Sequence, residues 1–589
     1  MTFNTIYNRR MGTRTMYAVL EEAARAFGNA PALHQPTGKG NYQTYTWLDY
    51  QRAAQEIACG LGQLGIRKGD TVALHSETRA EFYLADLGVL ANGSIAAALY
   101  TTYPLAEQVN NIRASHAKAV FMEDPKSMQA LIAEAGEPFP GLHWILLTGE
   151  SDGALSLEQL RSKGRAALKE DSHAFEKIHS KVHAHDAAIL YLTSGATGEP
   201  KMGLVSHAAL TSNIDMGPLI LPLTPADATI AFLPSAHIAQ RVVIEMLPIR
   251  MGVPVWFSES LAKLPHEMKT IRPTFLLAPP RVWERIFASV NTEIKKKSTV
   301  VRKIFHGAVG LGAEVSRLRE EGKPVPKGML AMLKIADRLV FSKIRARLGG
   351  RIKVAASGAA PLGKDLARFY AAIGMPLIEG YGLTEGGVVC LNPIDRPKSG
   401  SIGIRLPGVE LRLAEDGELL VKSPALFSGY PHDPEATASV LRDGWLYTGD
   451  IAEIDSEGYV YITGRKKELI VSSNGKKIYP ARIELLFKTE PIINQVVLIG
   501  DRLPYVTALV TINTAEVATS AEAEVKKAVA RVNRKLAPFE QIRRFRILQR
   551  DFSIESGELT PTMKVRRSRV LENHREVVSE LYIGKEESQ

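Results

Sequence analysis

Residues 187–207 read AAILYLTSGATGEPKMGLVSH and join an apolar run, a loop of hydroxyls and glycines, and a lysine. The run 187–192 predicts a short buried strand. Six residues of the following segment are suited to bind an anion: Thr193, Ser194, Gly195, Thr197, Gly198 and Lys201. Glycines let backbone N–H groups turn toward the anion, hydroxyls add donors, and the lysine adds a point charge. The stretch therefore predicts a phosphate-binding loop.

This loop does not have the Walker A pattern. Its glycines and lysine do not fit the spacing G-x-x-x-x-G-K-[ST], and Met202 follows Lys201 where Walker A has Ser or Thr. An ordinary turn rich in Gly, Ser and Thr between two strands is the alternative interpretation. The stretch alone leaves both interpretations open, and the rest of the chain has to separate them.

Composition limits the class of protein. The chain has 589 residues, of which 45% are hydrophobic and 23% charged, as in a globular protein with several structural units. Its net charge of +10 favours a nucleotide, a coenzyme, nucleic acid or an anionic membrane as partner, unless the excess has no functional meaning. Two cysteines, Cys59 and Cys390, indicate neither a disulfide framework nor a cysteine zinc site.

Targeting and membrane signals are weak. The first residues lack the apolar core of a signal peptide, and the most apolar run, 84–100, is interrupted by Asp86, Asn92 and Ser94. We therefore expect a cytoplasmic protein.

Outward from the loop, strands and helices alternate, which predicts a mainly parallel α/β sheet. Helical spacing covers 16–27, 46–64 and 81–91. The expected strands are 71–75, 94–99, 228–233, 254–257, 274–278, 352–355 and 376–379. From residue 408 the pattern becomes β-rich, with strands at 410–413, 418–421 and 459–463.

A charged break, GRKKE at 464–468, precedes a small α+β unit. There we expect helices at 482–487 and 521–535 and strands at 494–500 and 505–512. We divide the chain into a large domain, 1–465, and a small domain, 466–589.

Residues 286–351 lack strand signals and predict a helical insertion. The segment holds 15 Lys and Arg against 5 Asp and Glu, densest at KKK 295–297. A solvated helical face is the favoured interpretation, because charge runs usually mark exposed surfaces. A surface for anionic lipid or coenzyme phosphates is the alternative.

Four further clusters carry chemistry. ASGAAPL at 356–362 would let a flat ring approach the backbone. EGYGLTE at 379–385 offers Tyr381 for stacking, Thr384 for a phosphate and Glu385 for Mg²⁺. WLYTGD at 445–450 ends in Asp450, a carboxylate for ribose hydroxyls, and LTPTMK at 559–564 places Lys564 on a tight loop. Each alone is also compatible with a βα turn, a hairpin or a solvated lysine.

Together and in this order the clusters resemble the adenylate-forming, AMP-binding superfamily, from about residue 27 to 567. Three segments and the insertion are most similar to long-chain fatty acyl-CoA synthetases: LPSAHIAQR 233–241, RPTFLLAPPRVWERI 272–286 and TGRKKELIVSSNGKKIYP 463–480. The resemblance implies a large α/β domain with a β-rich part and a small mobile domain. It also implies that a medium- or long-chain fatty acid and ATP give acyl-AMP and pyrophosphate, and that coenzyme A then takes the acyl group.

The resemblance implies a role for each site residue. The 193–201 loop binds the β- and γ-phosphates of ATP, Thr384 the α-phosphate, and Glu385 the Mg²⁺ ion. The other implied roles are adenine binding by Ala359, Ala360 and Tyr381, ribose binding by Asp450 and Arg465, and transition-state neutralisation by Lys564. Lys467 would be the hinge, and Gly475 would belong to the coenzyme A side. His237 matches a position that borders the acyl pocket, and a buried structural histidine is the alternative.

Two residues depart from the family pattern, and several alternatives stay open. Ala196 removes a hydroxyl from the loop, which costs about 1 kcal/mol of phosphate binding, and Met202 replaces a small residue and is expected at most to pack behind the loop. A fatty acyl-AMP ligase that loads a carrier protein is one alternative, although no inserted segment lies near Lys467. A catalytically silent binding protein at a membrane surface is another, and a luciferase-like oxygenase is remote. We expect no nucleic-acid partner; peripheral membrane contact, and monomer or homodimer, stay open.

Overall fold

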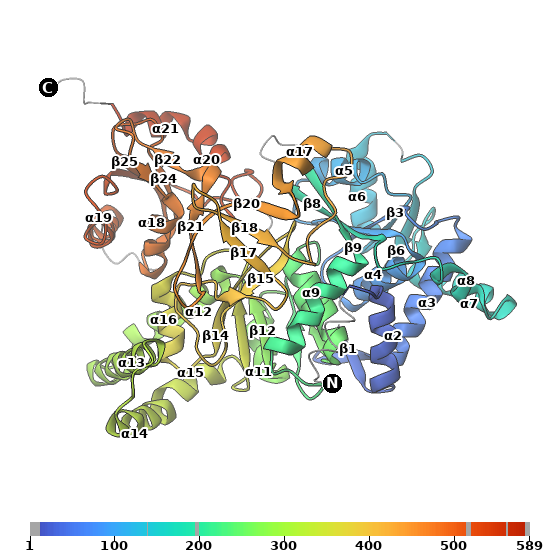
Figure 1. The fold of residues 1–589 in the computed structure, drawn as a ribbon, viewed down its shortest axis with the longest axis horizontal. Helices are drawn as coiled ribbons and strands as arrows, with labels where there is room; N and C mark the ends of the chain where they lie inside the picture. Colours follow the sequence, from blue (N-terminus) through green and yellow to red (C-terminus); the bar gives the residue numbers. More distant parts are fainter. Residues whose placement is uncertain (1–11, 138, 195–199, 514–519, 561–562, 584–589) are drawn as a thin grey trace.

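The computed structural model describes residues 12–137, 139–194, 200–513, 520–560 and 563–583. Within these residues the strands form two large sheets, a five-stranded sheet, a three-stranded sheet and a two-stranded ribbon. Figure 1 shows the two large sheets side by side, with the C-terminal segment above one end of them.

The seven-stranded sheet has the order β7-β6-β5-β3-β4-β8-β9 and is parallel except for the last pair. Its strands are β3 (Thr71–His75), β4 (Ile95–Ala98), β5 (Ala119–Met122), β6 (His143–Leu146), β7 (Leu155–Ser156), β8 (Ala187–Ser194) and β9 (Pro200–Ser206).

The nine-stranded sheet has the order β16-β15-β14-β13-β12-β10-β11-β1-β2. Its central strands are parallel, and antiparallel strands lie at both edges. The strands are β1 (Pro31–Gly38), β2 (Asn41–Thr46), β10 (Thr229–Ala231), β11 (Val255–Phe257), β12 (Phe275–Ala278), β13 (Val354–Ser357), β14 (Leu377–Leu383), β15 (Gly387–Leu391) and β16 (Ile404–Arg405).

Helices fill the space between the two large sheets and cover their outer faces. Side chains alternate along each strand, so Ala96 and Ala98 join the central core whereas Ala97 joins the cluster under α5 and α6. Every residue of α4 except Glu81 is buried, because the helix contacts strands of both sheets. The helices of this part are α2 (Met16–Phe27), α3 (Trp47–Gln63), α4 (Ala80–Asn92), α5 (Leu105–Ala114), α6 (Pro125–Ala135), α7 (Leu157–Glu170), α8 (Ala174–His179), α9 (His207–Ile220), the π-helix η1 (Gln240–Met246), α10 (Leu247–Met251) and α11 (Leu264–Ile271).

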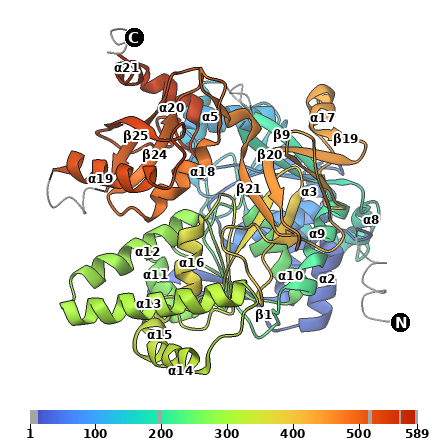
Figure 2. The ribbon, with the colours of Figure 1, turned by 60° about the vertical axis from the view of Figure 1, so that its left-hand side comes forward.

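The expected helical insertion is present. It begins with α12, whose Trp283 is buried under the nine-stranded sheet, and it projects away from the sheets in Figure 2. Its helices, with α16 packed beside them, are α12 (Pro280–Lys295), α13 (Thr299–Glu320), α14 (Lys327–Ala336), the π-helix η2 (Asp337–Phe341), α15 (Ser342–Ala346) and α16 (Lys364–Ala372). No helix in the described ranges combines the length and apolarity needed to cross a bilayer.

The remaining elements form the β-rich part and the C-terminal segment. The five-stranded sheet contains β17 (Glu410–Leu413), β18 (Glu418–Lys422), β19 (Leu441–Arg442), β20 (Trp445–Ile454) and β21 (Val460–Arg465), with α17 (Pro434–Val440) beside it. The short helix η3 (Lys466–Glu468) follows. Beyond it lie β22 (Ile470–Val471), β23 (Lys477–Ile478), α18 (Pro480–Glu484), η4 (Leu485–Thr489), β24 (Ile493–Ile499), β25 (Val506–Ile512), α19 (Ala521–Asn533), β26 (Ile542–Ile547), α20 (Arg567–Asn573) and α21 (Arg575–Glu580). This segment has cores of its own on both faces of its three-stranded sheet. The predicted fold class, mainly parallel α/β layers with a β-rich part and a small α+β unit, is confirmed.

Candidate active site

The predicted phosphate loop joins the antiparallel hairpin β8–β9. The backbones of Thr193 and Ser194 pair with Lys201 and Pro200. Gly195, Ala196, Thr197 and Gly198 lie outside the described residues, so the structure does not separate a phosphate loop from an ordinary turn. Met202 pairs with Leu192 and packs into the apolar cluster under α5 and α6, as expected for a residue behind the loop.

Tyr430 links Lys201 to Glu385. The Lys201 ammonium lies 5.2 Å from the centroid of the Tyr430 ring, a cation–π distance. The Tyr430 hydroxyl donates to Oε1 of Glu385 at 2.7 Å. Thr384 lies beside Gly203 of β9, where an added Cβ would sit 3.6 Å from the threonine methyl. Three predicted phosphate and metal residues therefore meet around Tyr430, which sequence reasoning missed because a single tyrosine in a polar loop carries no local signal.

Asp450 is buried and lies between two other predicted residues. The Tyr381 hydroxyl donates to its Oδ2 at 2.5 Å, and Arg465 Nε lies 2.9 Å from its Oδ1. This geometry follows from strand register, because β20 and β21 pair Asp450 directly with Arg465. Burial, and then the Asp450 charge, raises the pKa of Tyr381 well above its ordinary value, so the tyrosine remains a donor.

The loop after β13 holds Ala359 in a left-handed conformation with φ of +69°, which is rare for a residue other than glycine. Glu379 of β14 stabilises this loop. Its carboxylate accepts hydrogen bonds from Leu362 N at 3.3 Å and Gly400 N at 3.1 Å, and burial raises its pKa to about 7. Ala360 is exposed at the tip of the same loop. Glu379 is a second residue whose positioning role the sequence did not reveal.

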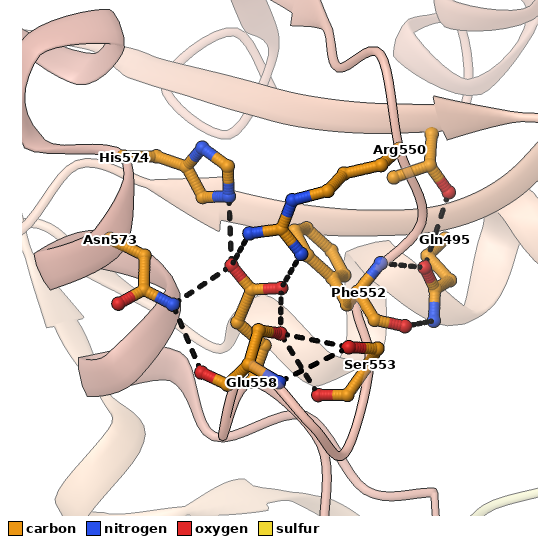
Figure 3. A network of polar contacts seen from close by, with 9 residues as sticks. Gln495, Arg550, Phe552, Ser553, Glu558, Asn573 and His574 are labelled. Atoms are coloured by element: carbon orange, nitrogen blue, oxygen red, sulfur yellow. Dashed lines mark hydrogen bonds and ion pairs between the residues drawn. The ribbon is translucent and has the colours of Figure 1, made fainter.

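Lys564 sits on a short hairpin next to the buried Glu558, whose polar contacts are shown in Figure 3. Leu559 pairs with Val565, and Thr560 N donates to Lys564 O at 2.8 Å. Glu558 accepts from Ser556 Oγ at 2.7 Å and from Arg550, Asn573 and His574 at 2.9–3.3 Å. Burial acts to raise the pKa of Glu558, but the Ser556 and Asn573 hydrogen bonds and the Arg550 charge outweigh it and hold the pKa below its ordinary value.

The Lys564 ammonium lies among the other charged site residues. The residue as a whole is exposed, whereas its charged end is crowded by protein atoms. Burial, followed by the Arg465 charge, lowers its pKa to about 8, while Asp450 and Glu385 act in the opposite direction. The C-terminal segment therefore brings Lys564 into one site with Glu385, Asp450 and Arg465.

An apolar pocket adjoins these residues and is open at its mouth. Ala359, Tyr381 and His237 line it together with side chains from α9, η1 and strands β12, β14 and β15. The apolar lining residues are Ile214, Ile220, Leu221, Ile238, Val242, Val243, Leu247, Phe275, Leu277, Ile378, Val388, Leu391 and Leu406.

His237 lines this pocket as a neutral side chain. Burial, and then the Lys564 charge, lowers its pKa to about 3. Ala239 N donates to His237 Nδ1 at 3.1 Å, so the proton is assigned to Nε2. His237 is therefore a pocket residue with one N–H to donate, and its influence on Lys564 places it near the charged site; its role in binding an acyl chain stays a prediction.

A buried ion pair fixes the π-helix behind His237. Arg241 of η1 and Asp86 of α4 are both fully buried and paired. Burial, and then Asp86, raises the pKa of the neighbouring Glu245, which makes Glu245 the protonated member of the carboxyl pair. Removing one partner of such a pair leaves an uncompensated charge, so the pair resists movement of the pocket wall.

Lys467 follows the site residue Arg465 by two positions, whereas Gly475 lies in a turn further along the chain. Lys467 is exposed in η3, and Gly475 is exposed in the turn between β22 and β23, with φ of +72°. The C-terminal segment contacts the large α/β part through ion pairs of Lys488 with Glu284 at 2.7 Å and of Lys535 with Asp365 at 3.2 Å. The structure thus brings Lys564, and not Gly475, to the charged site.

The site suits a magnesium ion that is shared with phosphates. The described residues contain no group of three metal-ligating His, Cys, Asp or Glu side chains, so they form no all-protein metal cage. Mg²⁺ is usually held by one or two carboxylates together with substrate phosphates. Glu385, oriented by Tyr430 and lying beside Thr384, fits that arrangement.

Fold and site together define an adenylate-forming enzyme. The profile of the family described as "AMP-binding enzyme" matches residues 20–431, and that of "AMP-binding enzyme C-terminal domain" matches residues 467–586. The chain belongs to the AMP-binding enzyme family.

Its relatives include long-chain-fatty-acid–CoA ligases. One from Mycobacterium bovis is 34% identical, and the match covers 91% of this chain and 92% of that ligase. One from Rattus norvegicus is 27% identical over 96% of this chain and 93% of that ligase.

Two solved structures show the same fold. An anthranilate CoA ligase in complex with anthranoyl-AMP has a TM-score of 0.75 and 18% identity, covering 97% of this chain and 99% of its own. ATP-bound MatB from Rhodopseudomonas palustris has a TM-score of 0.71 and 23% identity, covering 96% of this chain and 99% of its own.

Proposed function

We propose that this enzyme activates a medium- or long-chain fatty acid with ATP and transfers the acyl group to coenzyme A. The observation that supports this most is the continuity of the site. One apolar pocket begins at Ala359, Tyr381 and His237 and extends between α9 and η1, so a carboxylate at its mouth lies beside Lys564. A long apolar lining fits an alkyl chain, whose burial contributes about 0.8 kcal/mol per methylene.

In the first half-reaction the fatty carboxylate attacks the α-phosphorus of ATP, and pyrophosphate leaves. Two anions have to meet, so the site must supply positive charge and aimed donors. Lys564 neutralises charge between the carboxylate and the α-phosphate, and Thr384 donates to that phosphate. Asp450 and Arg465 bind the ribose.

Adenine lies against Ala359, Ala360 and Tyr381 in this proposal. The 193–201 loop and Lys201 bind the β- and γ-phosphates. Glu385 would hold Mg²⁺, which would supply charge neutralisation for the phosphates when it is bound. The Tyr430 hydroxyl keeps the Glu385 carboxylate oriented toward this position.

In the second half-reaction the coenzyme A thiolate attacks the acyl carbon of acyl-AMP, and AMP leaves. We divide the chain into a large domain, 1–465, and a small domain, 466–589, joined by a hinge at Lys467. Rotation at this hinge withdraws Lys564 and brings the turn at Gly475 to the coenzyme A side. The arrangement described here, with Lys564 among the charged residues, is that of the first half-reaction. We place the enzyme in the cytoplasm, with peripheral contact at the inner face of the membrane.

Pyrophosphate exchange tests the proposal. Fatty acids of graded length are each assayed for ATP–pyrophosphate exchange without coenzyme A, and for AMP release with and without it. Exchange should depend on the fatty acid, and AMP release should require coenzyme A. No exchange with any medium or long fatty acid refutes the proposal in favour of a silent binding protein.

The carrier-protein alternative makes a different prediction in the same panel. An acyl-AMP ligase shows exchange, but coenzyme A does not stimulate its AMP release. Coenzyme A-independent exchange with no thioester product therefore overturns the second half of the proposal and leaves the first intact.

A further inference from the structure

The helical insertion exposes an unusual share of apolar side chains. Of seventeen exposed large apolar side chains among the described residues, six lie on α13, α14 and η2. They are Val300 (66% exposed), Val301 (42%), Ile304 (53%), Met332 (58%), Ile335 (60%) and Leu339 (55%). Met332, Ile335 and Leu339 follow the spacing i, i+3, i+7 of one helix face.

These side chains face away from the core because the opposite sides of the same helices are occupied. Phe305 of α13 and Phe341 of η2 are buried in one apolar cluster under the nine-stranded sheet. None of the six exposed apolar residues lines the acyl pocket. Figure 2 shows α13 and α14 at the periphery of the molecule, so the surface is accessible.

Basic residues are interleaved with these apolar ones. Lys296 and Lys297 precede α13, and Lys303 lies between Val301 and Ile304. Lys334 and Arg338 alternate in the same way with the apolar residues of α14 and η2. In the part of the chain that the structure describes, these five form no ion pair with an acidic side chain, and all five are exposed.

We propose that the hairpin of α13 and α14 is a docking surface for an anionic phospholipid bilayer. Apolar side chains enter the interface between headgroups and acyl chains, while lysines and arginines pair with anionic headgroups. A solvated face, the interpretation favoured from charge alone, does not account for the apolar side chains. If the proposed function holds, this surface brings the enzyme to the membrane, into which long fatty acids partition.

Two other occupants are distinguishable. A nucleic acid would use the basic residues but gain nothing from exposed valine, isoleucine and leucine side chains. A second copy of this chain carries the same positive charge, so two such surfaces would repel each other. The interleaved pattern therefore favours lipid.

Vesicle binding tests this surface without any assay of catalysis. The intact protein is sedimented with vesicles of phosphatidylglycerol and phosphatidylethanolamine, or of phosphatidylcholine alone, at low and high salt. One variant carries Lys296→Gln, Lys297→Gln and Lys303→Gln; a second carries Val300→Ser, Ile304→Ser and Ile335→Ser. Each lysine near an anionic surface contributes roughly a fivefold change in partition, so the first variant should bind on the order of 100-fold less. The second should lose about tenfold or more on anionic vesicles.

Matched variants at exposed positions elsewhere are the controls. Ile132→Ser, Leu261→Ser and Leu413→Ser remove equal apolar character, and Lys177→Gln, Lys422→Gln and Arg502→Gln remove equal charge. These should bind vesicles like the wild type, and every variant should retain exchange activity with a soluble medium-chain acid. The proposal would be overturned if the control variants lost as much vesicle binding as the test variants, or if high salt did not weaken binding by the wild type. It would also be overturned if the protein preferred a DNA duplex to vesicles, or if it self-associated in a way that the apolar variant abolishes.

Discussion

The lowered pKa of Lys564 predicts that the rate of the first half-reaction falls at alkaline pH, which gives its pH–rate profile an alkaline limb. The sign follows from the direction of the shift: the ammonium form is needed, and it is lost as pH rises through the lowered pKa. With a pKa of about 8, about nine tenths of Lys564 is protonated at pH 7 and about one tenth at pH 9. Adenylation kcat/KM, which reports the free enzyme, should therefore fall about tenfold between these pH values.

An ordinary lysine would behave differently. With an unperturbed pKa near 10.4, less than about 5% of the ammonium form is lost at pH 9, so the rate would hardly change. The pH at which the rate falls therefore reports how far burial and the Arg465 charge lower the pKa of Lys564. Bound ATP adds negative charge, so the corresponding limb in kcat should lie at higher pH.

The assay is fatty-acid-dependent ATP–pyrophosphate exchange from pH 6 to pH 10 on the wild type and two variants. Lys564→Arg keeps its charge throughout, so whatever activity it retains should lack the limb near pH 8. Lys564→Ala should lose about 100-fold or more at pH 7, also without a limb. Thioester formation from supplied acyl-adenylate at pH 7 should be much less affected and shows that the variants are folded.

A limb near pH 8 that persists in Lys564→Ala would refute this assignment, because another group would then titrate. Equal loss of both half-reactions in Lys564→Ala would show that the lysine serves the fold or both arrangements.

Three more substitutions test separate parts of the molecule. Lys467→Pro should spare pyrophosphate exchange but slow acyl-CoA formation severely, because proline fixes φ and prevents a second hinge conformation; parallel loss, or no loss, removes the hinge from this position. Tyr430→Phe should raise the Mg²⁺ concentration needed for half-maximal exchange roughly tenfold, since the Glu385 carboxylate loses its hydroxyl donor; an unchanged Mg²⁺ titration would contradict a metal role for Glu385. Glu558→Ala should lower the free energy of unfolding by about 3 kcal/mol in urea titrations, because Arg550 and neighbouring donors lose a buried partner, and an effect below about 1 kcal/mol would show that the network is dispensable.

Much of the fold could be predicted because its strands are short apolar runs between helices with clear periodicity. The helix at 16–27 and the strand at 71–75 were predicted with their observed bounds. β1 was not predicted, because Pro31, Pro36 and Gly38 are typical of a loop, and it is stable as a strand only near the sheet edge. The strand β26 was also not predicted, because three of its six residues are arginines. Its hydrophobicity pattern does not distinguish a strand from a charged surface segment.

The site was less predictable than the fold. Sequence motifs identified the residues that contact the proposed ligands. The residues that orient those site residues are single side chains in segments without a recognisable motif. Tyr430 contacts Glu385 and Lys201 from far along the chain, and Glu379 binds two loops through backbone N–H groups. Asp86 stood out in the sequence as a charged residue within an apolar run. Its pairing with Arg241 could not be predicted, because the pairing depends on how two helices far apart in the sequence pack together.

In the proposed domain division, the two protein partners of Asp450 would link nucleotide binding to the hinge at Lys467. Tyr381 and Arg465 each engage one carboxylate oxygen, and the remaining lone pairs of both oxygens can accept ribose hydroxyls, so a bound ribose shares Asp450 with them. Arg465 is the last residue of β21, directly before η3 and Lys467. Any ribose hydroxyl that weakens the Arg465 contact would loosen the strand end next to the proposed hinge. Nucleotide binding would then set how firmly the proposed hinge is held to Asp450.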